Sequence, residues 1–176
     1  MRAVALLRGV NVGGRSRVPM GELRQLFQEL GLADVQTYVQ SGNIVFSSPR
    51  RSAESLVPVF ERKIAAAFGV QTKVLIRSAR QLAALEHPFL GDEKELSRLH
   101  VLFLGDRPGR TAVGRLDTER SPSDRFEVKA REIFLHYPNG AGRSKLTTDY
   151  FERVLGTVGT ARNWRTVLKL QELTAS

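Results

Sequence analysis

Strand and helix signals follow one another in the order β-α-β-β-α-β over the first 77 residues or so of the chain. The predicted strands lie at 3–7, 35–39, 44–47 and 72–76, and the predicted helices at 19–30 and 52–68. The turn Ser41-Gly42 separates the two strands of a hairpin, and its glycine suits the positive φ of a tight turn. This order predicts a ferredoxin-like sheet in which the first two strands are parallel and the third lies between them.

The second half of the chain repeats most of this order. It has strand signals at 99–104, 126–128 and 133–135, a weak helix within 110–118, a helix starting near Ser144, and a last helix from Asn163 to about Leu173 in place of a fourth strand. Ser78 and Gln81 form a capping box that starts a short helix. We therefore expect a subdomain over 1–86, a connector over 87–98 and a second α+β subdomain over 99–176.

The first predicted strand, residues 3–7, is apolar on both alternations, so both of its faces need cover. Helices of a ferredoxin-like unit cover only one face of the sheet. The fold class we expect is therefore α+β, with a ferredoxin-like N-terminal half packed on a second, similar half.

Composition restricts the protein class. The chain is 41% hydrophobic and 26% charged, and it contains no cysteine and no apolar run of about 18 residues. These values exclude a disordered chain and predict no membrane span, and the apolar run at 3–7 is too short for a signal peptide. The absence of cysteine fits a reducing cytoplasm, where we expect the protein to lie. We expect no cofactor or metal site, because no ligand cluster, nucleophile motif or paired carboxylates occur.

The net charge of +9 favours an anionic partner. Arginine supplies most of the excess, and either selection for binding or a G+C-rich coding sequence would produce it. The basic residues are scattered along the chain, which is also typical of a solvated surface without a dedicated patch.

Two candidate binding loops fall in the first half. The first runs from Arg8 to Gly14 and contains Asn11 and Gly13; it joins a strand to a helix, where backbone N–H groups can hold an anion. The alternative is a long connection that needs glycines for its turns. The second is Gln40-Ser41-Gly42-Asn43, which is also a plain hairpin turn. Because the first two strands are parallel, both loops emerge at the same end of the sheet and their polar side chains can converge on one pocket.

Two further candidates fall in the second half. Residues 138–145 carry Gly142, Arg143, Ser144 and Lys145, and Ser144 as N-cap would present a helix N-terminus flanked by two cations. The segment 160–165 carries Arg162 and Asn163, with Asn163 as the N-cap of the last helix. For both segments the alternative is capping alone, and Trp164 is then a core residue. His136, like His87 and His100, is more typical of a packed or solvated histidine than of a catalytic one.

Four strings of the sequence together resemble a bacterial family catalogued as domain of unknown function 1697. The strings are LLRGVNVGG with VPM, YVQSGNIVF, LHYPNGAGRSKLT and TARNWRTVLKL, and the resemblance covers the chain from residue 3 to about residue 173. The resemblance implies a two-part α+β protein with no assigned activity. It places the family's polar signature positions at Arg8, Asn11, Gly13, Gly14, Gln40, Ser41, Asn43, Gly142, Arg143, Ser144, Lys145, Arg162, Asn163 and Trp164.

Three functions remain open on sequence grounds. The favoured one is binding of a small anionic, phosphate- or nucleotide-like ligand in a pocket formed by these loops, with the signature residues other than Trp164 as ligand-binding residues. A nucleic-acid-binding module is less favoured. Such modules stack bases on exposed aromatic side chains of their central strands, and the only aromatic residue in the expected first and third strands is Phe46, at a position we expect to be buried. A ligand-free interaction protein is the third. The sequence identifies neither an enzymatic activity nor an oligomeric state.

Overall fold

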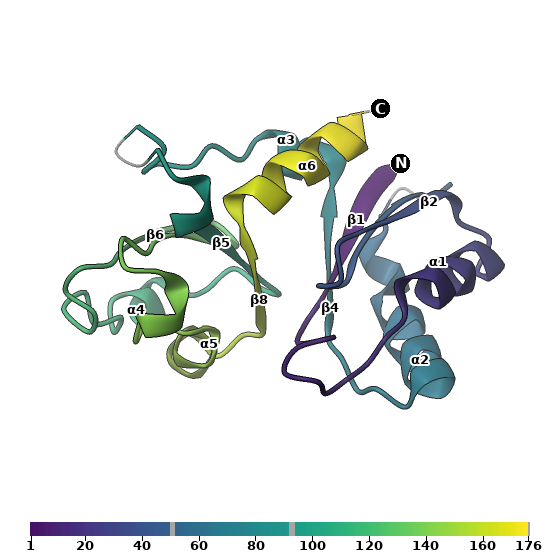
Figure 1. Ribbon diagram of the computed structural model, residues 1–176, viewed down its shortest axis with the longest axis horizontal. Helices are drawn as coiled ribbons and strands as arrows, with labels where there is room; N and C mark the ends of the chain where they lie inside the picture. The colour runs from purple at the N-terminus through teal and green to yellow at the C-terminus, as the bar shows by residue number, and fades with distance from the viewer. Residues whose placement is uncertain (50–51, 92–93, 176) are drawn as a thin grey trace. The chain divides into compact units, whose positions relative to one another are not determined.

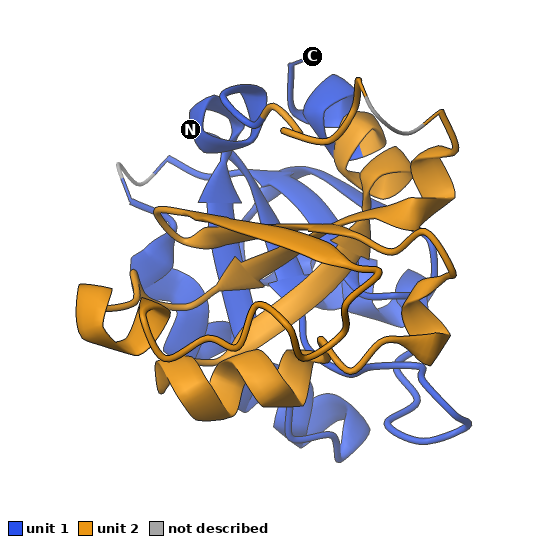
Figure 2. Cartoon of the chain, turned by 90° about the vertical axis from the view of Figure 1, so that its left-hand side faces the viewer, with its two compact units in different colours: residues 1–85, 170–176 blue, residues 86–169 orange. Residues whose placement is uncertain are grey.

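A computed structural model of the chain describes residues 1–49, 52–91 and 94–175. The chain divides into two compact units (Figure 2): unit 1 comprises Met1–Leu85 and Leu170–Ser176, and unit 2 comprises Glu86–Lys169. Each unit is built on one four-stranded antiparallel sheet with helices, so the fold is α+β with two similar halves. The expected connector at 87–98 includes residues 92–93, which lie outside the described residues.

Unit 1 has the ferredoxin-like order. Its elements are β1 (Arg2–Leu7), α1 (Met20–Glu29), β2 (Ala33–Tyr38), β3 (Asn43–Ser47), a 3₁₀ turn (Glu54–Leu56), α2 (Val57–Phe68), β4 (Val74–Ser78) and α3 (Ala79–Ala83). The strands lie in the order β2-β3-β1-β4, and β3 is antiparallel to both β1 and β2. The first two strands are therefore parallel with the third between them, as the sequence predicts. Figure 1 shows α1 and α2 on one face of this sheet.

An aromatic cluster occupies the core between this sheet and its helices. Phe27 of α1, Phe46 of β3 and Phe60 of α2 are almost fully buried, and their ring centroids lie 4.4 to 6.0 Å apart. Aromatic pairs at such distances add stability beyond their buried area. Phe46 is thus buried as expected and offers no exposed ring for a base.

The other alternation of β1 is buried as well. Val4 and Leu6 have no exposed surface. Ala3, Ala5 and Leu7, which face the helices, have none either. The prediction of a strand buried on both faces is confirmed.

The end of the chain belongs to unit 1. The helix α6 (Trp164–Ala175) begins in unit 2, and its last turns lie in unit 1. There the amide of Gln171 donates to the carbonyl oxygens of Leu82 and Leu85 at 2.8 and 3.1 Å. The guanidinium of Arg2 donates to the carbonyl oxygen of Leu173 at 3.0 Å. The C-terminal turns are therefore fixed to both β1 and the segment around α3.

Unit 2 contains a complete second copy of the order. Its elements are a 3₁₀ turn (Leu96–Arg98), β5 (Leu99–Leu104), α4 (Arg110–Val113), β6 (Arg125–Lys129), β7 (Glu132–His136), a 3₁₀ turn (Ala141–Arg143), α5 (Thr148–Leu155) and β8 (Gly159–Asn163). The strand order β6-β7-β5-β8 corresponds to that of unit 1, and α4 and α5 lie on one side of the sheet (Figure 1).

Two expectations about unit 2 are wrong. A fourth strand exists, since β8 pairs with β5 over Gly159–Asn163 before the last helix begins. The sequence pattern does not predict β8, because Arg162 and Asn163 interrupt its apolar residues. Ser144 is not an N-cap: α5 begins at Thr148, and Thr147 accepts the capping bond from Tyr150 N at 3.2 Å.

The two units share individual hydrogen bonds as well as strand order. At the hairpin turn, Leu7 N donates to Gly42 O in unit 1 and Leu104 N donates to Arg131 O in unit 2, both at 2.8 Å. In each unit, the residue that directly follows the first strand donates its N–H to the carbonyl oxygen of the residue that directly precedes the fourth strand.

The helix-to-strand contacts repeat too. Glu61 of α2 accepts from Val74 N at 3.0 Å, and Glu152 of α5 accepts from Gly159 N at 2.8 Å. In both cases the acceptor is a helix glutamate and the donor is the first residue of the fourth strand.

A buried arginine occupies the same place in each sheet. Arg77 of β4 is paired with Val4 of the first strand, and Arg162 of β8 is paired with Val101 of the equivalent strand. Each guanidinium donates to the carbonyl oxygen of the residue before it, at 3.0 and 2.8 Å. The repeat that is not evident in the sequence is therefore present at the level of single contacts.

Candidate functional site

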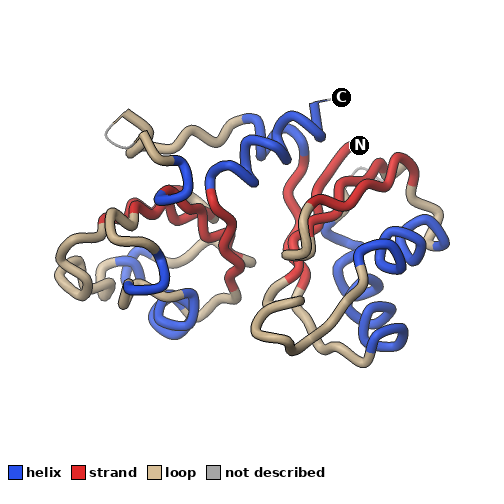
Figure 3. Tube along the Cα trace, viewed as in Figure 1, coloured by secondary structure: helices blue, strands red, loops and turns tan. Residues whose placement is uncertain are grey.

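The long connection from β1 to α1, drawn as a tan loop in Figure 3, is folded on itself. Asn11 N donates to Ser16 O at 3.0 Å, and Arg15 N donates to Val12 O at 3.1 Å. Gly13 and Gly14 occupy the turn between them with φ of 59° and 73°. Two successive positive φ values are typical of a type I′ turn, which glycine adopts without steric penalty.

The side chain of Asn11 joins this loop to the β2–β3 turn. Its amide nitrogen donates to Val18 O at 2.9 Å and to Gln40 O at 2.8 Å, and its amide oxygen accepts from Val18 N at 2.8 Å. Both donors and one acceptor site of the amide are therefore engaged with backbone groups. The expected proximity of the two loops is present, and Asn11 is the residue that creates it.

We expect Asn11→Ala to lower the free energy of unfolding by about 2 kcal/mol, because three backbone groups lose their partner. Hydrogen exchange at the amide of Val18, which donates to Asn11, should accelerate in this variant. Gln25→Ala is a matched control, since its amide bonds only to Glu29 on the exposed surface of α1. Unchanged exchange at Val18 would contradict a role for Asn11 in fixing the loop.

Asn43 and Gly42 fix the β2–β3 turn. Asn43 has no exposed surface, and its amide nitrogen donates to Tyr38 O at 2.9 Å and to Ser41 Oγ at 3.0 Å. Gly42 has a φ of 76°, and a Cβ built at this position would lie 2.6 Å from a methyl carbon of Val10 and 2.7 Å from Cβ of Leu7. The turn therefore requires glycine for both its φ and the close approach of the strand end.

Arg8 begins the loop. Its backbone N–H donates to Lys73 O at 2.9 Å, its carbonyl oxygen accepts from the hydroxyl of Thr72 at 2.8 Å, and its side chain is half-buried. Unit 1 thus gathers one group of expected residues at the C-terminal end of β1, namely Arg8, Asn11, Gly13, Gly14, Gln40, Ser41 and Asn43. Their role as ligand-binding residues stays a prediction.

The remaining expected residues lie in unit 2, at the end of the sheet where β5 begins. His136 at the end of β7 pairs with Leu99, and Asn163 at the end of β8 pairs with His100. Residues 138–145 follow β7, and Arg162 and Asn163 are the last residues of β8, so both segments lie at the same end of this sheet. A common pocket for this group and the group in unit 1 stays a prediction.

The segment 138–145 contains the 3₁₀ turn Ala141–Arg143, and the helix that follows begins only at Thr148, with Thr147 as its N-cap. Gly142, Arg143 and Lys145 are exposed, while Ser144 Oγ accepts from Leu146 N at 2.9 Å. The buried hydroxyl of Tyr137 donates to Leu146 O at 2.9 Å, and burial together with the Asp124 carboxylate raises the pKa of Tyr137. Ser144 therefore offers an anion no helix dipole, contrary to the expectation from the sequence.

Arg162 and Asn163 have internal partners. Arg162 is buried and donates to Thr160 Oγ1 at 2.8 Å, and burial lowers its pKa to about 10. Asn163 Oδ1 accepts from Thr166 N at 2.9 Å, which is the N-cap bond that the sequence predicts for the last helix. Trp164 is 2% exposed, and its Nε1 has no hydrogen-bond partner among the described residues.

Three histidines lie close together in unit 2. His87 Nε2 lies 3.1 Å from His100 O, and the rings of His87 and His136 both pack on Phe89. Burial lowers the pKa of His87, and it lowers the pKa of His100 to about 4. These two rings are therefore neutral at pH 7. Spacing along the chain does not predict that distant histidines meet, because the contact depends on how the segment after α3 returns to the sheet.

Unit 1 contains a cavity of about 470 Å³ between α2 and the segment before β4. We call it the basic cavity; it is lined by Pro58, Glu61, Arg62, Ala65, Gln71, Thr72 and Lys73. Lys73 Nζ lies 3.4 Å from the carboxylate of Glu61, and Arg62 is exposed at the cavity. Sequence reasoning missed these residues because they lie on a regular amphipathic helix and in a short connection.

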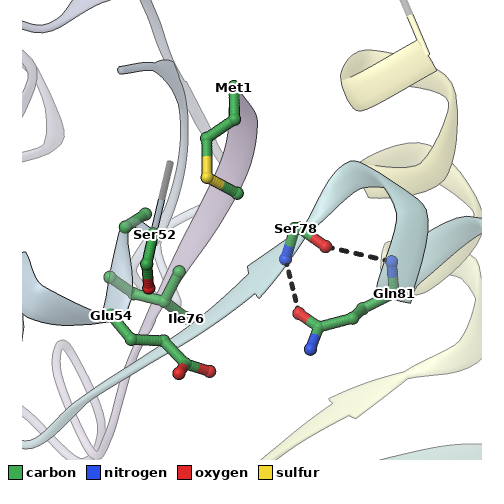
Figure 4. Close-up of a pocket in the computed structure, with 7 residues that line it drawn as sticks. Met1, Ser52, Glu54, Ile76, Ser78 and Gln81 are labelled. Atoms are coloured by element: carbon green, nitrogen blue, oxygen red, sulfur yellow. Dashed lines mark hydrogen bonds between the residues drawn. The ribbon is translucent and has the colours of Figure 1, made fainter. Parts of the chain in front are cut away.

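A smaller cavity of about 200 Å³ lies near the N-terminus (Figure 4). Met1, Ser52, Glu54 and Ile76 line it together with Ser78 and Gln81. The side chains of Ser78 and Gln81 bond to each other's backbone in the capping box of α3, at 3.2 and 2.8 Å. They are therefore occupied with starting a helix. None of the loop residues expected from the sequence lines either of these two cavities.

The described residues contain neither a metal-ligand cluster nor a helix suited to a bilayer. No group of three or more His, Asp or Glu side chains among them is placed to hold a metal ion. None of the helices they form has the length and apolarity needed to cross a membrane.

Comparison with known proteins identifies a family of unknown function and a similar solved structure. The sequence profile of the family described as "Protein of unknown function (DUF1697)" matches residues 1–134. A solved structure described as that of the conserved bacterial protein SP0830 from Streptococcus pneumoniae is similar over 98% of each chain, with 25% identity and a TM-score of 0.73. No curated protein matches the sequence.

Proposed function

Because the chain belongs to the DUF1697 family of proteins of unknown function, we propose its function from geometry: it binds a small anionic, phosphate-bearing ligand in the basic cavity of unit 1. The observation that carries the proposal is a concave site of about 470 Å³ with Arg62 and Lys73 in its lining. Ligand pockets for small molecules fall between about 300 and 1,000 Å³. A cavity of this size accommodates a phosphorylated metabolite.

The polar lining suits an anion. Arg62 supplies a planar guanidinium and Lys73 a point charge, while Glu61 is the one carboxylate among the lining residues. Glu61 also accepts from Val74 N at 3.0 Å, so its charge is partly satisfied by the protein. Gln71 and Thr72 add an amide and a hydroxyl for the uncharged part of a ligand.

Backbone contacts hold the wall of the cavity in place. The hydroxyl of Thr72 donates to Arg8 O at 2.8 Å, and Lys73 O accepts from Arg8 N at 2.9 Å. These bonds tie residues 72–73 to the end of β1. A site on a fixed segment loses less conformational entropy when it binds a ligand. The basic cavity therefore lies directly beside the first predicted binding loop.

The proposal is tested by thermal unfolding of the full chain with inorganic phosphate and a panel of phosphorylated metabolites. A ligand at a hundred times its dissociation constant adds about 2.7 kcal/mol to the free energy of unfolding. We expect Lys73→Met and Arg62→Ala each to weaken binding about tenfold, because each removes a charge-assisted hydrogen bond.

Lys63→Ala is the matched control, since Lys63 is exposed on the same helix and does not line the cavity. Equal losses in Lys63→Ala and Arg62→Ala would indicate non-specific attraction to a basic protein. A stabilising ligand whose effect persists in both cavity variants but disappears in Arg8→Ala or Arg143→Ala would place the site at the signature loops. No stabilisation by any anion would overturn the proposal.

A further inference from the structure

The loop after β1 and the β2–β3 turn are longer than the corresponding connections of unit 2. In unit 2, residues 105–109 make the connection from the first strand to the first helix, and residues 130–131 make the hairpin turn. In unit 1 the same connections take residues 8–19 and 39–42. The shorter versions close an equivalent sheet with the same strand-end hydrogen bonds, so the extra residues of unit 1 are not required to close the fold.

The tips of these two connections expose aliphatic side chains. Val12 is 65% exposed and Val39 is 47% exposed. The bond from Asn11 to Gln40 O holds the two tips together at 2.8 Å. We define the loop platform as Val12, Arg15, Arg17, Val39 and Gln40, all of which are exposed. Two exposed valines therefore lie on connections that a hydrogen bond joins.

Val39 is also strained. Its φ is 50°, in the left-handed region, which is a true outlier for a β-branched residue. The equivalent residue of unit 2, Ala130, has a φ of 52°, so the left-handed conformation belongs to the turn that both units share, and the β-branched side chain makes it costly in unit 1. Asparagine would adopt this φ more easily, and Val39 is too exposed to be needed for the core.

The charge of the platform selects an acidic partner. The two connections, residues 8–19 and 39–42, contain three arginines and no carboxylate. Arg15 and Arg17 have no ion-pair partner in the part of the chain that the structure describes, and neither Gly13 N–H nor Gly14 N–H donates a hydrogen bond there. Cations and open backbone donors beside aliphatic side chains complement a segment in which carboxylates and aliphatic residues alternate.

A single-stranded nucleic acid fits this surface less well. Bases stack on exposed aromatic rings, and within these two segments Phe46 is fully buried and Tyr38 is half-buried. We propose that the loop platform is a docking site for an acidic, aliphatic-containing segment of a partner protein. The proposal is independent of the basic cavity, whose residues are not part of the platform.

The test is a titration of the ¹⁵N-labelled full chain with a synthetic peptide in which Glu and Asp alternate with Leu and Ile. We expect the amide signals of residues 9–17 and 39–42 to move and those of unit 2 to stay. Arg15→Ala and Val12→Ser should weaken binding by about tenfold and threefold, whereas Arg24→Ala, an exposed arginine on α1, should not change it. Absence of binding at millimolar peptide, or shifts elsewhere, would overturn the proposal.

Val39→Asn separates docking from folding. Relief of strain should raise the unfolding temperature by about 3 °C, while loss of the exposed aliphatic side chain should weaken peptide binding about threefold. A merely structural role for Val39 would leave peptide affinity unchanged. Oligouridine RNA is the competing probe. If the platform binds the RNA with an affinity that falls steeply as the salt concentration rises, and does not respond to the peptide, the proposal is also overturned.

Discussion

Gly42→Ala is expected to lower the free energy of unfolding by about 3 kcal/mol. Two effects add at this position: alanine at a φ of 76° is disfavoured by about 1 to 2 kcal/mol, and its Cβ would lie 2.6 and 2.7 Å from atoms of Val10 and Leu7. Both neighbours are buried, so neither side chain can move into solvent to make room. The backbone of the turn must shift instead, and the Leu7 N to Gly42 O bond is strained with it.

The measurement is urea unfolding at pH 7, with Gly13→Ala as the matched control. Gly13 has a φ of 59°, but a Cβ at this position would have nothing within 4 Å, so the control isolates the conformational penalty of about 1 kcal/mol. Equal losses of unfolding free energy in the two variants would show that the turn can shift at no cost. The close approach at Gly42 would then contribute nothing to the effect of the substitution.

Acidification from pH 7 to pH 5 is expected to remove roughly 2 kcal/mol of stability through His100 alone, because burial lowers its pKa in the folded state to about 4 from the ordinary histidine value of 6.5. The unfolded chain therefore binds more protons than the folded chain between these two pH values. The stabilisation from the neutral ring is complete above pH 6.5 and is lost as the pH falls toward 4. His87, whose pKa burial also lowers, acts in the same direction.

This effect is read between pH 7 and about 5.5, above the range in which ordinary carboxylates titrate. His100→Gln should be less stable at pH 7 but should show a clearly flatter decline over this interval, because the group that takes up the proton is gone. A slope in the variant equal to that of the original chain would show that other groups cause the acid sensitivity.

Sequence periodicity predicted most of the fold because apolar spacing reports burial directly. The hairpin around Gly42, the helix that ends before Gly31 and the strand at 99–104 all follow from that signal. The strand β8 was missed because Arg162 is buried through hydrogen bonds to Thr160 and a backbone carbonyl, and a sequence pattern counts such an arginine as exposed. The start of α5 was misplaced by three residues because Ser144 and Thr147 are both good N-caps, and only packing decides between them.

The candidate site was predictable in part. Parallel β1 and β2 imply that Asn11 and Gln40 lie at one end of the sheet, and the bond between them agrees. The sequence could not show that both N–H groups of the Asn11 amide bond to backbone carbonyls, because that depends on how the loop folds back. It also could not show the basic cavity, since Arg62 and Lys73 are separated by the end of α2 and meet only through the return to β4.

Unit 1 is closed by residues from both ends of the chain, and this has a consequence for biosynthesis. The bonds of Gln171 to the segment after α3 and of Leu173 to Arg2 form only when the last residues are present. A chain emerging from the ribosome therefore carries an unfinished N-terminal half during the whole synthesis of unit 2. The half that begins first is completed last.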